Sequence, residues 1–532
     1  MTDVKENDAV QCQENIPDTR SNLDQQIPPS TQTMSGDTDA TNAMAIEGEN
    51  VSDTTDQALV TDTNLPTCIP TNVFVFIGSD GNPYLGISGE KNATALPIGG
   101  KAANRLLQEF SQQQTGARLK TYELREINEE LTAYAEHCGV IHDVYYRCAP
   151  FQNGIELDIG DDHRIRVTPG KVAVIKKGSE TLFYRTSTMR PLPIPAEIGN
   201  LKLLDKYLNL HPTHIVLIRA YLTYTLAHPK VSTTSFIILV LFGDQGSGKT
   251  FLCKIIQDLI DPNLVGVQTF PSNEKDLVIA ANHSHVLFYD NMRDIKPSMA
   301  DKLCIAATGG HLTARRLYTD CELQTHRLHV ALVLNGIHSF LNQPDLSQRS
   351  LPLQLLSIDE KNRCSETELL LEFQTDLPAI FRGLLDLTAE ILKHLPSVEV
   401  SSPERMYDFS QWLAAMEKVE GVPPDVYQTE YSNALNEGML DSLLDNLLAS
   451  AVMSFITDGH RNRWSGTPRE LLSELNTLVG NRSRYSKDWP QTASALSKRL
   501  KPLQAGLRRQ GIEIEFGRGK HRNITIINLE AF

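Results

Sequence analysis

The chain of 532 residues is 41% hydrophobic, 7% aromatic and 22% charged, with a formal net charge of −15 at pH 7. This composition excludes a wholly disordered or fibrous protein, and the length allows roughly three or four domains. The longest uninterrupted apolar run, residues 236–242, is far shorter than the ~20 residues that cross a bilayer, and residues 1–30 lack the apolar segment of a signal peptide. We therefore expect a cytoplasmic protein without a membrane partner.

The charge is unevenly distributed along the chain. Residues 1–66 carry thirteen acids against Lys5 and Arg20, and they hold no Phe, Tyr or Trp. Such a segment cannot bury enough apolar surface to offset the entropy of ordering, so we expect a disordered acidic tail. Residues 460–523 carry fourteen Lys and Arg against five acids. The net charge therefore conceals a basic C-terminal domain. The eight cysteines form no C-x-x-C pair, which favours reduced thiols and argues against a zinc module.

Residues 72–190 have the pattern of a small α+β domain. An apolar strand begins at Val73, and helical stretches follow at about 101–113 and 121–137. From 143 to 184 the residues alternate with period two, which predicts antiparallel strands. Asp158 is the residue nearest to the paired carboxylates of a primase domain. It lies between two alternating strands, so we interpret it as part of a hairpin turn and expect no primase activity.

A nucleotide-binding α/β core is expected over residues 200–358, after a linker at 189–195 and a helix at about 212–228. The segment 243–250 fits G-x-x-x-x-G-K-[ST] at every fixed position, directly after a buried-strand pattern and directly before a helical one. Such a loop turns backbone N–H groups and the positive end of a helix toward phosphates. The expected nucleotide-binding residues are Gly243, Asp244, Gln245, Gly246, Ser247, Gly248, Lys249 and Thr250. Lys249 would reach the β- and γ-phosphates, and Thr250 would hold Mg²⁺.

A second metal-binding residue is expected at the end of a neighbouring strand. Asp290 follows four apolar or aromatic residues, where the chain would leave the sheet, so we predict that it completes the Mg²⁺ site. An ordinary strand-ending Asp in a turn is the alternative. Asn291 follows; an amide can orient a water molecule but cannot accept its proton. Either another group is then the general base, or hydrolysis is slow.

Two later segments carry further polar candidates. A Gly-Gly turn at 309–310 leads to Arg315 and Arg316, which suits a loop that contacts a polyanion; a solvated hairpin is the alternative. A third strand ends in Asn335, where a polar side chain could sense the γ-phosphate or position water. Arg349 precedes the final strand and cannot easily reach its own phosphate. It could act as an arginine finger on a neighbouring subunit, and the alternative is a surface salt bridge.

The last 170 residues or so predict helices and then a winged-helix domain. Residues 359–457 read as a helical lid or linker. Residues 458–532 predict helices followed by two strands and a basic hairpin, as in a winged helix. Candidate DNA contacts in this domain are Lys498, Arg499, Arg508, Arg509, Arg518, Lys520 and Arg522. A packing module with a solvated basic face is the alternative. The pairs His283/His285 and His326/His329 lack Cys or carboxylate partners, and we interpret both as structural.

Together these segments resemble the ATPase core of AAA+ proteins of the superfamily 3 helicase type, and most of all the primase-helicase-like ATPases of bacterial prophages and integrative elements. The resemblance rests on the phosphate loop, FYDN, ATGGHLTARRLYTD, VALVLNGI and PDLSQRSLPLQL, and is specific over about 235–358. It implies Walker A roles for Lys249 and Thr250, a Walker B role for Asp290 and a sensor role for Asn335. It also implies an intersubunit finger at Arg349 and a DNA-facing hairpin at Arg315 and Arg316.

The resemblance further implies ATP and Mg²⁺ as cofactors and a ring-shaped homo-oligomer, often a hexamer, with single-stranded DNA in its channel. The chain departs from the wider superfamily at Asn291, where a second acid is common. The first functional hypothesis is an ATP-driven DNA translocase or helicase of a mobile-element replication system, with duplex DNA at the winged helix. The second is a DNA-bound ATP switch, such as a regulator or loader, that separates no strands.

Overall fold

The computed structural model describes most of the chain beyond residue 68. The described residues are 69–89, 91–160, 162–293, 295–315, 323–337, 340–341, 343–458, 461–480, 484–486, 488–517 and 523–529. The expected acidic tail lies outside them, as do Arg316, Arg518, Lys520 and Arg522. The two compact units of the chain divide between Asn64 and Leu65.

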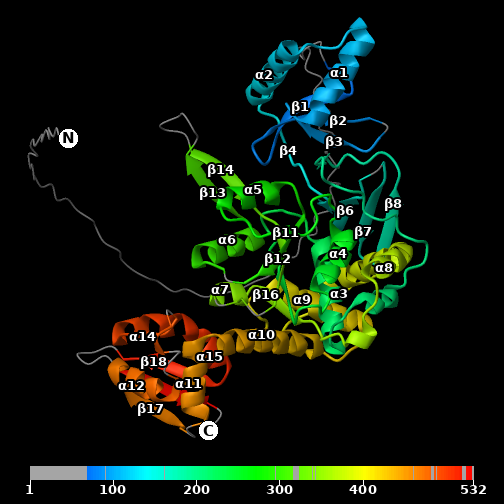
Figure 1. Ribbon diagram of the computed structural model, residues 1–532. Helices are drawn as coiled ribbons and strands as arrows, with labels where there is room; N and C mark the ends of the chain where they lie inside the picture. Colours follow the sequence, from blue (N-terminus) through cyan, green and yellow to red (C-terminus); the bar gives the residue numbers. More distant parts are fainter. Residues whose placement is uncertain are drawn as a thin grey trace, which may run out of the picture. The chain divides into compact units, whose positions relative to one another are not determined.

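A five-stranded sheet opens the described part of the chain (Figure 1). Its strands, in the order β4-β1-β2-β3-β9, are β4 (Ile141–His142), β1 (Val73–Gly78), β2 (Pro83–Ile87), β3 (Thr94–Pro97) and β9 (Phe183–Tyr184). Helices α1 (Lys101–Thr115) and α2 (Thr121–Cys138) share an apolar cluster with this sheet. Both helices and the first strand match the ranges predicted from periodicity.

A separate four-stranded antiparallel sheet follows. It runs in the order β5 (Cys148–Phe151), β6 (Gly154–Asp158), β7 (Arg164–Thr168), β8 (Lys171–Ile175). The segment expected to form one small domain thus contains two sheets. The apolar side chains of β6 and β7 belong to the same buried cluster as the helices and strands after residue 200, because alternation leaves one face that only those elements cover.

The hairpin turn predicted at Asp158 is confirmed by the pairing of β6 with β7, in which Asp158 lies opposite Arg164. The carboxylate is fully buried and accepts hydrogen bonds from Arg164 and Arg185. Burial would raise the pKa of Asp158, but the two guanidinium groups outweigh burial and hold the pKa below its ordinary value. This aspartate is therefore engaged in a structural ion network.

The central sheet is entirely parallel and has the order β11-β12-β15-β10-β16. Its strands are β10 (Ile238–Phe242), β11 (Gln268–Thr269), β12 (Val286–Met292), β15 (Ala331–Gly336) and β16 (Ser350–Gln354). Alternate residues of β10 enter different clusters: Leu239 and Leu241 pack in one, Ile238 and Val240 in the other. The sheet is therefore covered on both faces, which explains why its strands read as continuous apolar runs.

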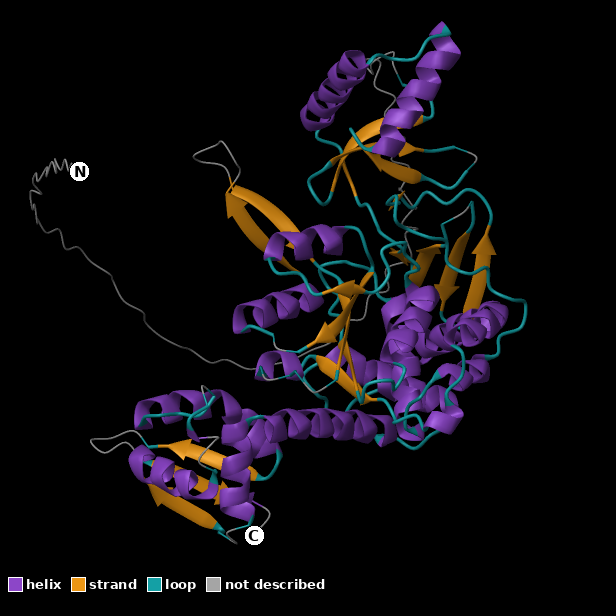
Figure 2. Cartoon of the chain, viewed as in Figure 1, coloured by secondary structure: helices purple, strands orange, loops and turns teal. Residues whose placement is uncertain are grey.

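Helices supply the two covering layers (Figure 2). One cluster includes side chains of α3 (Pro212–Ala227), α4 (Lys249–Ile260) and α8 (Glu366–His394). The other includes side chains of α5 (Glu274–Asn282), α6 (Pro297–Thr308) and the short α7 (Pro344–Ser347). Between α6 and β15 the chain forms the antiparallel pair β13 (Gly310–Arg315) and β14 (Leu323–Leu328), so this segment contains the hairpin that both the resemblance and the alternative interpretation implied.

The helical segment after residue 359 contains α8, α9 (Tyr407–Glu420), α10 (Val426–Asp445) and α11 (Leu447–Thr457). Within the described residues no single helix has the length and apolar character that crossing a membrane requires. Helices α10 and α11 are long and apolar enough for a membrane span only when they are taken as one segment, and the chain bends by 102° between them.

The segment after α11 contains a three-stranded antiparallel sheet. Its order is β17 (Arg463–Gly466), β19 (Ile524–Asn528), β18 (Ile512–Phe516). Helices α12 (Pro468–Leu478), α14 (Ala493–Leu500) and α15 (Gln504–Arg509) share its apolar cluster. A capping box begins α12: the backbone N–H of Thr467 donates to the Glu470 carboxylate at 2.7 Å, and the backbone N–H of Glu470 donates to the Thr467 hydroxyl at 3.3 Å. Strand β17, RWSG, was not anticipated, because four residues carry little periodicity.

Candidate functional site

Parallel strands bring three polar segments to one edge of the central sheet. In the register of the sheet, Leu241 of β10 lies opposite Asn335 of β15, and Tyr289 of β12 lies opposite Leu334 of β15. The loop 243–250 begins directly after β10, and Asp290 follows Tyr289. These groups therefore meet outside the carboxyl ends of the strands, where open α/β sheets bind ligands.

The backbone of the loop depends on its glycines. Gly243, Gly246 and Gly248 have φ angles of +149°, +83° and +90°, a region that side chains with a Cβ rarely adopt. A Cβ on Gly243 would also stand 2.9 Å from the carbonyl oxygen of Leu355. From outside the loop, the Asn209 amide donates to the carbonyl of Ser247 at 3.0 Å. The loop is thus fixed by backbone geometry and by one neighbouring amide.

The Lys249 ammonium lies against the loop itself. Its Nζ donates to the carbonyl oxygens of Gly243 and Asp244, each at 2.7 Å. Partial burial lowers the pKa of Lys249 from its ordinary value, while the carboxylates of Asp290 and Asp244 oppose that shift. A short rotation of the flexible side chain would carry this cation from carbonyl dipoles to phosphate oxygens.

Thr250 and Asp290 face each other across the site. The Thr250 hydroxyl donates to Asp290 Oδ2 at 3.0 Å. Mg²⁺ is bound in nucleotide sites through one or two protein oxygens, substrate phosphates and water. A hydroxyl and a carboxylate at this spacing, beside a phosphate-binding loop, fit that donor set. The separation of Thr250 and Asp290 by forty positions in the sequence explains why only the strand-end argument predicted their contact.

A bulge in β12 gives Asp290 its direction. The register with β15 shifts between Tyr289 and Met292, and Asn291 adopts φ +62° in the left-handed region. The N–H of Asn291 donates to Asp290 Oδ1 at 2.6 Å and to Asn335 Oδ1 at 3.3 Å. Asn335 is fully buried, and its amide donates to Cys253 Sγ at 3.3 Å. The structure therefore brings Asp290, Asn291 and Asn335 together as the sequence predicted.

A pocket of about 1070 Å³ opens over the loop. Besides the predicted residues, the pocket is lined by residues that the sequence motifs did not predict, among them Asn209, Arg293 and Arg363. The Arg363 guanidinium lies 3.8 Å from the position that a Cβ on Gly246 would take, so this cation stands beside the loop of its own chain. In the sequence, Arg363 is only a basic residue between the last strand and α8. That signal was too weak to identify it as part of the site.

Arg349 lies at the amino-terminal ends of the central strands, whereas the loop lies at their carboxyl ends. Its carbonyl accepts from the N–H of Ile238, the first residue of β10, so the five-residue strand separates it from the loop by roughly 16 Å. Its guanidinium forms an ion pair with Asp345, which also pairs with Arg405 at 2.7 Å. Arg349 therefore does not reach the pocket of its own chain, and the salt bridge considered as its alternative role is present.

The basic residues predicted to contact DNA differ in their exposure and in their ion pairs. Lys498 and Arg499 are exposed in the last turn of α14, and Arg508 is exposed beside Glu513. Arg509 instead forms an ion pair with Glu404, with its side chain 24% exposed. A phosphate contact by Arg509 does not fit this placement, because its guanidinium is used inside the chain. Arg315 ends β13; Arg316, Arg518, Lys520 and Arg522 lie outside the described residues.

Two of the histidines interpreted as structural, His285 and His329, do not line the pocket. His285 is buried and its Nε2 hydrogen-bonds the carbonyl of Thr225 at 3.0 Å. His329 is buried against the ring of Phe236. Among the residues that the structure describes, no group of three or more His, Cys, Asp or Glu side chains is placed to hold a metal ion.

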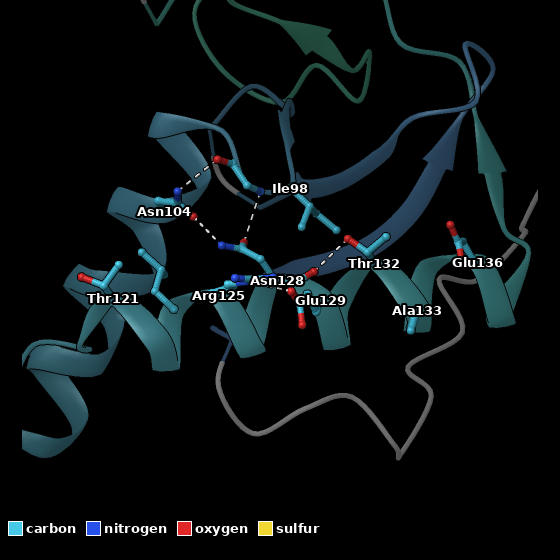
Figure 3. A pocket seen from close by; sticks show the side chains of 11 residues that line it. Ile98, Asn104, Thr121, Arg125, Asn128, Glu129, Thr132, Ala133 and Glu136 are labelled. Atoms are coloured by element: carbon cyan, nitrogen blue, oxygen red, sulfur yellow. Dashed lines mark hydrogen bonds and ion pairs between the residues drawn. The ribbon is translucent and has the colours of Figure 1, made fainter. Parts of the chain in front are cut away.

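A second pocket lies on α2, far along the chain from the loop (Figure 3). Its central polar groups satisfy one another: the Asn128 amide donates to Asn104 Oδ1, Asn104 donates to the carbonyl of Gly99, and the N–H of Gly99 donates to Asn128 Oδ1. Since these groups are already paired, they give no indication of a ligand.

Comparison with known proteins adds family information. Residues 212–438 match the family model described as actinomycete integrative conjugative element replication protein, and residues 448–531 match the model described as AICE RepA C-terminal domain. Together the two models cover more than half of the chain. No curated protein matches it.

Among solved structures, the chain is similar to two apo structures of the NrS-1 C-terminal region. The identities are 12% and 11%, and the TM-scores are 0.38 and 0.35. Each match covers 86% of this chain and 96% of the other. At these TM-scores the likeness supports no conclusion about mechanism.

Proposed function

Because this chain belongs to the family of actinomycete integrative conjugative element replication proteins, we propose that it is an ATP-driven DNA translocase or helicase that replicates such an element. The observation that carries this proposal is the convergence of Lys249, Thr250 and Asp290 on one pocket. A phosphate loop with a lysine, a hydroxyl and a strand-end carboxylate is the set of groups that phosphoryl transfer from a nucleoside triphosphate requires.

In this proposal each group has a separate task. Thr250 and Asp290 hold Mg²⁺, which would neutralise charge on the β- and γ-phosphates. Lys249 leaves the carbonyls of the loop and binds those phosphates, while the loop N–H groups bind the remaining oxygens. Asn291 lines the pocket and orients the attacking water. Its amide cannot take the proton, so the rate depends on another acceptor.

The ring is a further part of the proposal. Arg349 is too far from its own loop to stabilise the transition state there, which supports action on the pocket of a neighbouring subunit in a superfamily 3-type AAA+ assembly. The parallel sheet, with its phosphate loop after an inner strand, supports the same assignment. Single-stranded DNA would pass the β13–β14 hairpin in the channel.

The C-terminal segment would bind duplex DNA as a winged helix. Helix α11, strand β17, helices α12 and α14–α15, and the hairpin β18–β19 follow one another in the order that this motif needs. Exposed basic side chains at the end of α14 support the assignment. Such contacts position a protein on DNA without specifying sequence.

The alternative function is a DNA-bound ATP switch, in which nucleotide controls assembly and no strands separate. Asn291 favours it, because a site without an adjacent carboxylate base hydrolyses ATP slowly and would dwell in the ATP state. Family membership is equally compatible with both, since initiation and unwinding both serve replication.

Displacement of a labelled strand from forked DNA tests the two functions. If the protein is a helicase, the full chain with ATP and Mg²⁺ releases the strand, whereas a non-hydrolysable ATP analogue does not support release. Lys249→Ala serves as the inactive control. ATP-dependent assembly on DNA without displacement would favour the switch, and failure to bind nucleotide at all would overturn both.

A further inference from the structure

Asn335 has both ends of its amide engaged within the chain. Its side chain is fully buried, with Oδ1 accepting from the N–H of Asn291 and Nδ2 donating to Cys253 Sγ, both at 3.3 Å. A residue that sensed a γ-phosphate directly would need a free amide directed into the pocket. The contacts of Asn335 are instead with two other elements, α4 and the bulge of β12.

The orientation of this amide follows from its partners. A backbone N–H can only donate, so the group facing Asn291 must be the carbonyl oxygen, and the NH₂ group then faces the sulfur. Burial raises the pKa of Cys253 to about 12, so the thiol stays protonated and its sulfur acts as a weak acceptor. Cys253 lies one turn after Lys249 on α4, so the amide links the phosphate-loop helix to β12.

The bulge needs such support. Asn291 has φ +62°, a left-handed conformation that Asn adopts more readily than most residues with a Cβ but less readily than glycine. That conformation directs the Asn291 N–H toward both Asp290 Oδ1 and Asn335 Oδ1. The remaining oxygen of Asp290 is then left facing the Thr250 hydroxyl at 3.0 Å. Loss of the Asn335 contact would let the bulge relax and the carboxylate turn away.

We propose that Asn335 is a positioning residue that holds the Asp290–Asn291 bulge in the geometry required for the metal, and that Cys253 fixes its orientation. The inference rests on the proposed nucleotide site and reassigns one of its residues. Asn335 then acts on the Mg²⁺ site through Asp290, in the same way with a diphosphate as with a triphosphate.

Metal binding to the ADP complex tests this role without any catalytic turnover. Mn²⁺ replaces Mg²⁺, and its binding to the full chain with ADP is measured by electron paramagnetic resonance. Because ADP has no γ-phosphate, a γ-phosphate sensor cannot affect this equilibrium. We expect Asn335→Ala to weaken Mn²⁺ binding roughly tenfold, the factor that corresponds to an unsupported left-handed residue. Unchanged Mn²⁺ affinity, with weaker binding of a non-hydrolysable ATP analogue, would overturn the proposal.

The cysteine provides a matched pair of variants. Cys253→Ser keeps a hydrogen-bond acceptor at the same position and should retain Mn²⁺ affinity within about twofold of the unsubstituted chain, whereas Cys253→Ala removes the acceptor and should weaken binding by roughly threefold. Equal effects of the two substitutions would show that the cysteine only packs, and would remove it from the proposal.

A double substitution guards against a general folding defect. Glycine adopts the left-handed conformation without help, so in an Asn291→Gly background the loss of Asn335 should change Mn²⁺ affinity less than it does alone. Independent, multiplying effects would contradict the link between the two residues. Hydrogen exchange at the Asn291 amide should likewise accelerate in Asn335→Ala and stay slow in Cys253→Ser.

The outcome separates this inference from the proposed function. If the unsubstituted chain binds neither Mn²⁺–ADP nor the ATP analogue, the nucleotide site is wrong and the inference falls with it. If the unsubstituted chain binds both and Asn335→Ala binds equally well, the nucleotide site stands and the positioning role alone is refuted.

Discussion

Lys249 supplies the cation of a phosphate loop whose conformation depends on the backbone geometry of its glycines. Its Nζ donates to the carbonyls of Gly243 and Asp244 and to the Ser247 hydroxyl, so Lys249→Ala removes no buried ion pair and should leave the fold intact. We expect phosphate release to fall by about 100-fold or more, because a preorganised cation at the developing charge is lost. Lys254→Ala, on the same helix but paired with Glu366, is the matched control and should keep its rate.

Side chains that follow one another in the sequence were the predictable part of the site. The loop 243–250 was identified because its glycines and Lys249 are contiguous, and Asp290 because strand ends meet in a parallel sheet. Asn209, Arg363 and Cys253 were not predicted. Asn209 and Arg363 reach the site through tertiary packing, and the contact of Cys253 with Asn335 joins two separate elements, so no local pattern distinguishes these residues from other polar residues in helices and linkers.

Elements with long, regular patterns were also predictable. Helices α1, α2 and α3 appear within a few residues of the ranges read from periodicity. The division of residues 72–190 into two sheets was not apparent, because alternation reveals that a strand has one buried face but not which element covers it. The four-residue β17 was missed because its pairing with β19 is its main support.

Arg147 and Asp261 form a buried ion pair at the C-terminal end of α4 and the N-terminal end of β12. The opposite ends of these two elements carry Lys249 and Asp290. Asp261 ends α4 and accepts from Arg147 at 3.0 Å and from the N–H groups of His285 and Val286, where β12 begins. Both charged side chains are fully buried. Asp261→Asn would leave the arginine charge buried without its partner, so we expect the free energy of unfolding to fall by about 3–5 kcal/mol.

Urea unfolding followed by tryptophan fluorescence measures the loss. The exposed pair of Arg105 with Glu109 on α1 is the matched control, and Arg105→Ala should leave the urea midpoint unchanged. Equal midpoints for Asp261→Asn and the unsubstituted chain would contradict a structural role for the buried pair.

Helix α14 offers a test of DNA binding at the element scale. Lys498 is exposed at its end, whereas Arg509 is held by Glu404. In the full chain, Lys498→Gln should reduce the slope of log K against log salt by roughly one unit, and Arg509→Gln should leave the slope unchanged. Fluorescence anisotropy with duplex DNA at several salt concentrations measures both. A reversed order would indicate that Arg509 leaves its ion pair to bind phosphate.

The whole molecule should be sensitive to mild acid. Burial lowers the pKa of His228 and His285 to about 4 and that of His329 to about 3, with Lys230 and Arg327 adding to the shift at His329. The unfolded chain takes up these protons near pH 6.5, before the folded chain does. The stabilising contribution is therefore complete above about pH 6.5 and is lost as the pH falls toward 4.

Thermal melting between pH 7 and pH 5 checks this expectation. The melting temperature should decline across that interval, and the decline should be shallower for His329→Phe, which keeps the aromatic contact with Phe236 and removes one titrating group. A melting temperature that is constant over the interval would show that these rings protonate without cost in the folded state.

The proposed ring is tested by mixing two inactive variants. If Arg349 completes the neighbouring pocket, Arg349→Ala binds ATP, since its own Lys249 and Thr250 are intact, but hydrolyses it slowly. In a mixture with Lys249→Ala, some interfaces pair an intact phosphate loop from the first variant with an intact Arg349 from the second. We therefore expect partial recovery of phosphate release after subunit exchange, which fluorescence energy transfer between labelled subunits monitors. An arginine that only pairs with Asp345 within its own chain could not be complemented in this way. Confirmed exchange without recovery would therefore count against the finger, and would leave Arg349 as part of the salt bridge seen here.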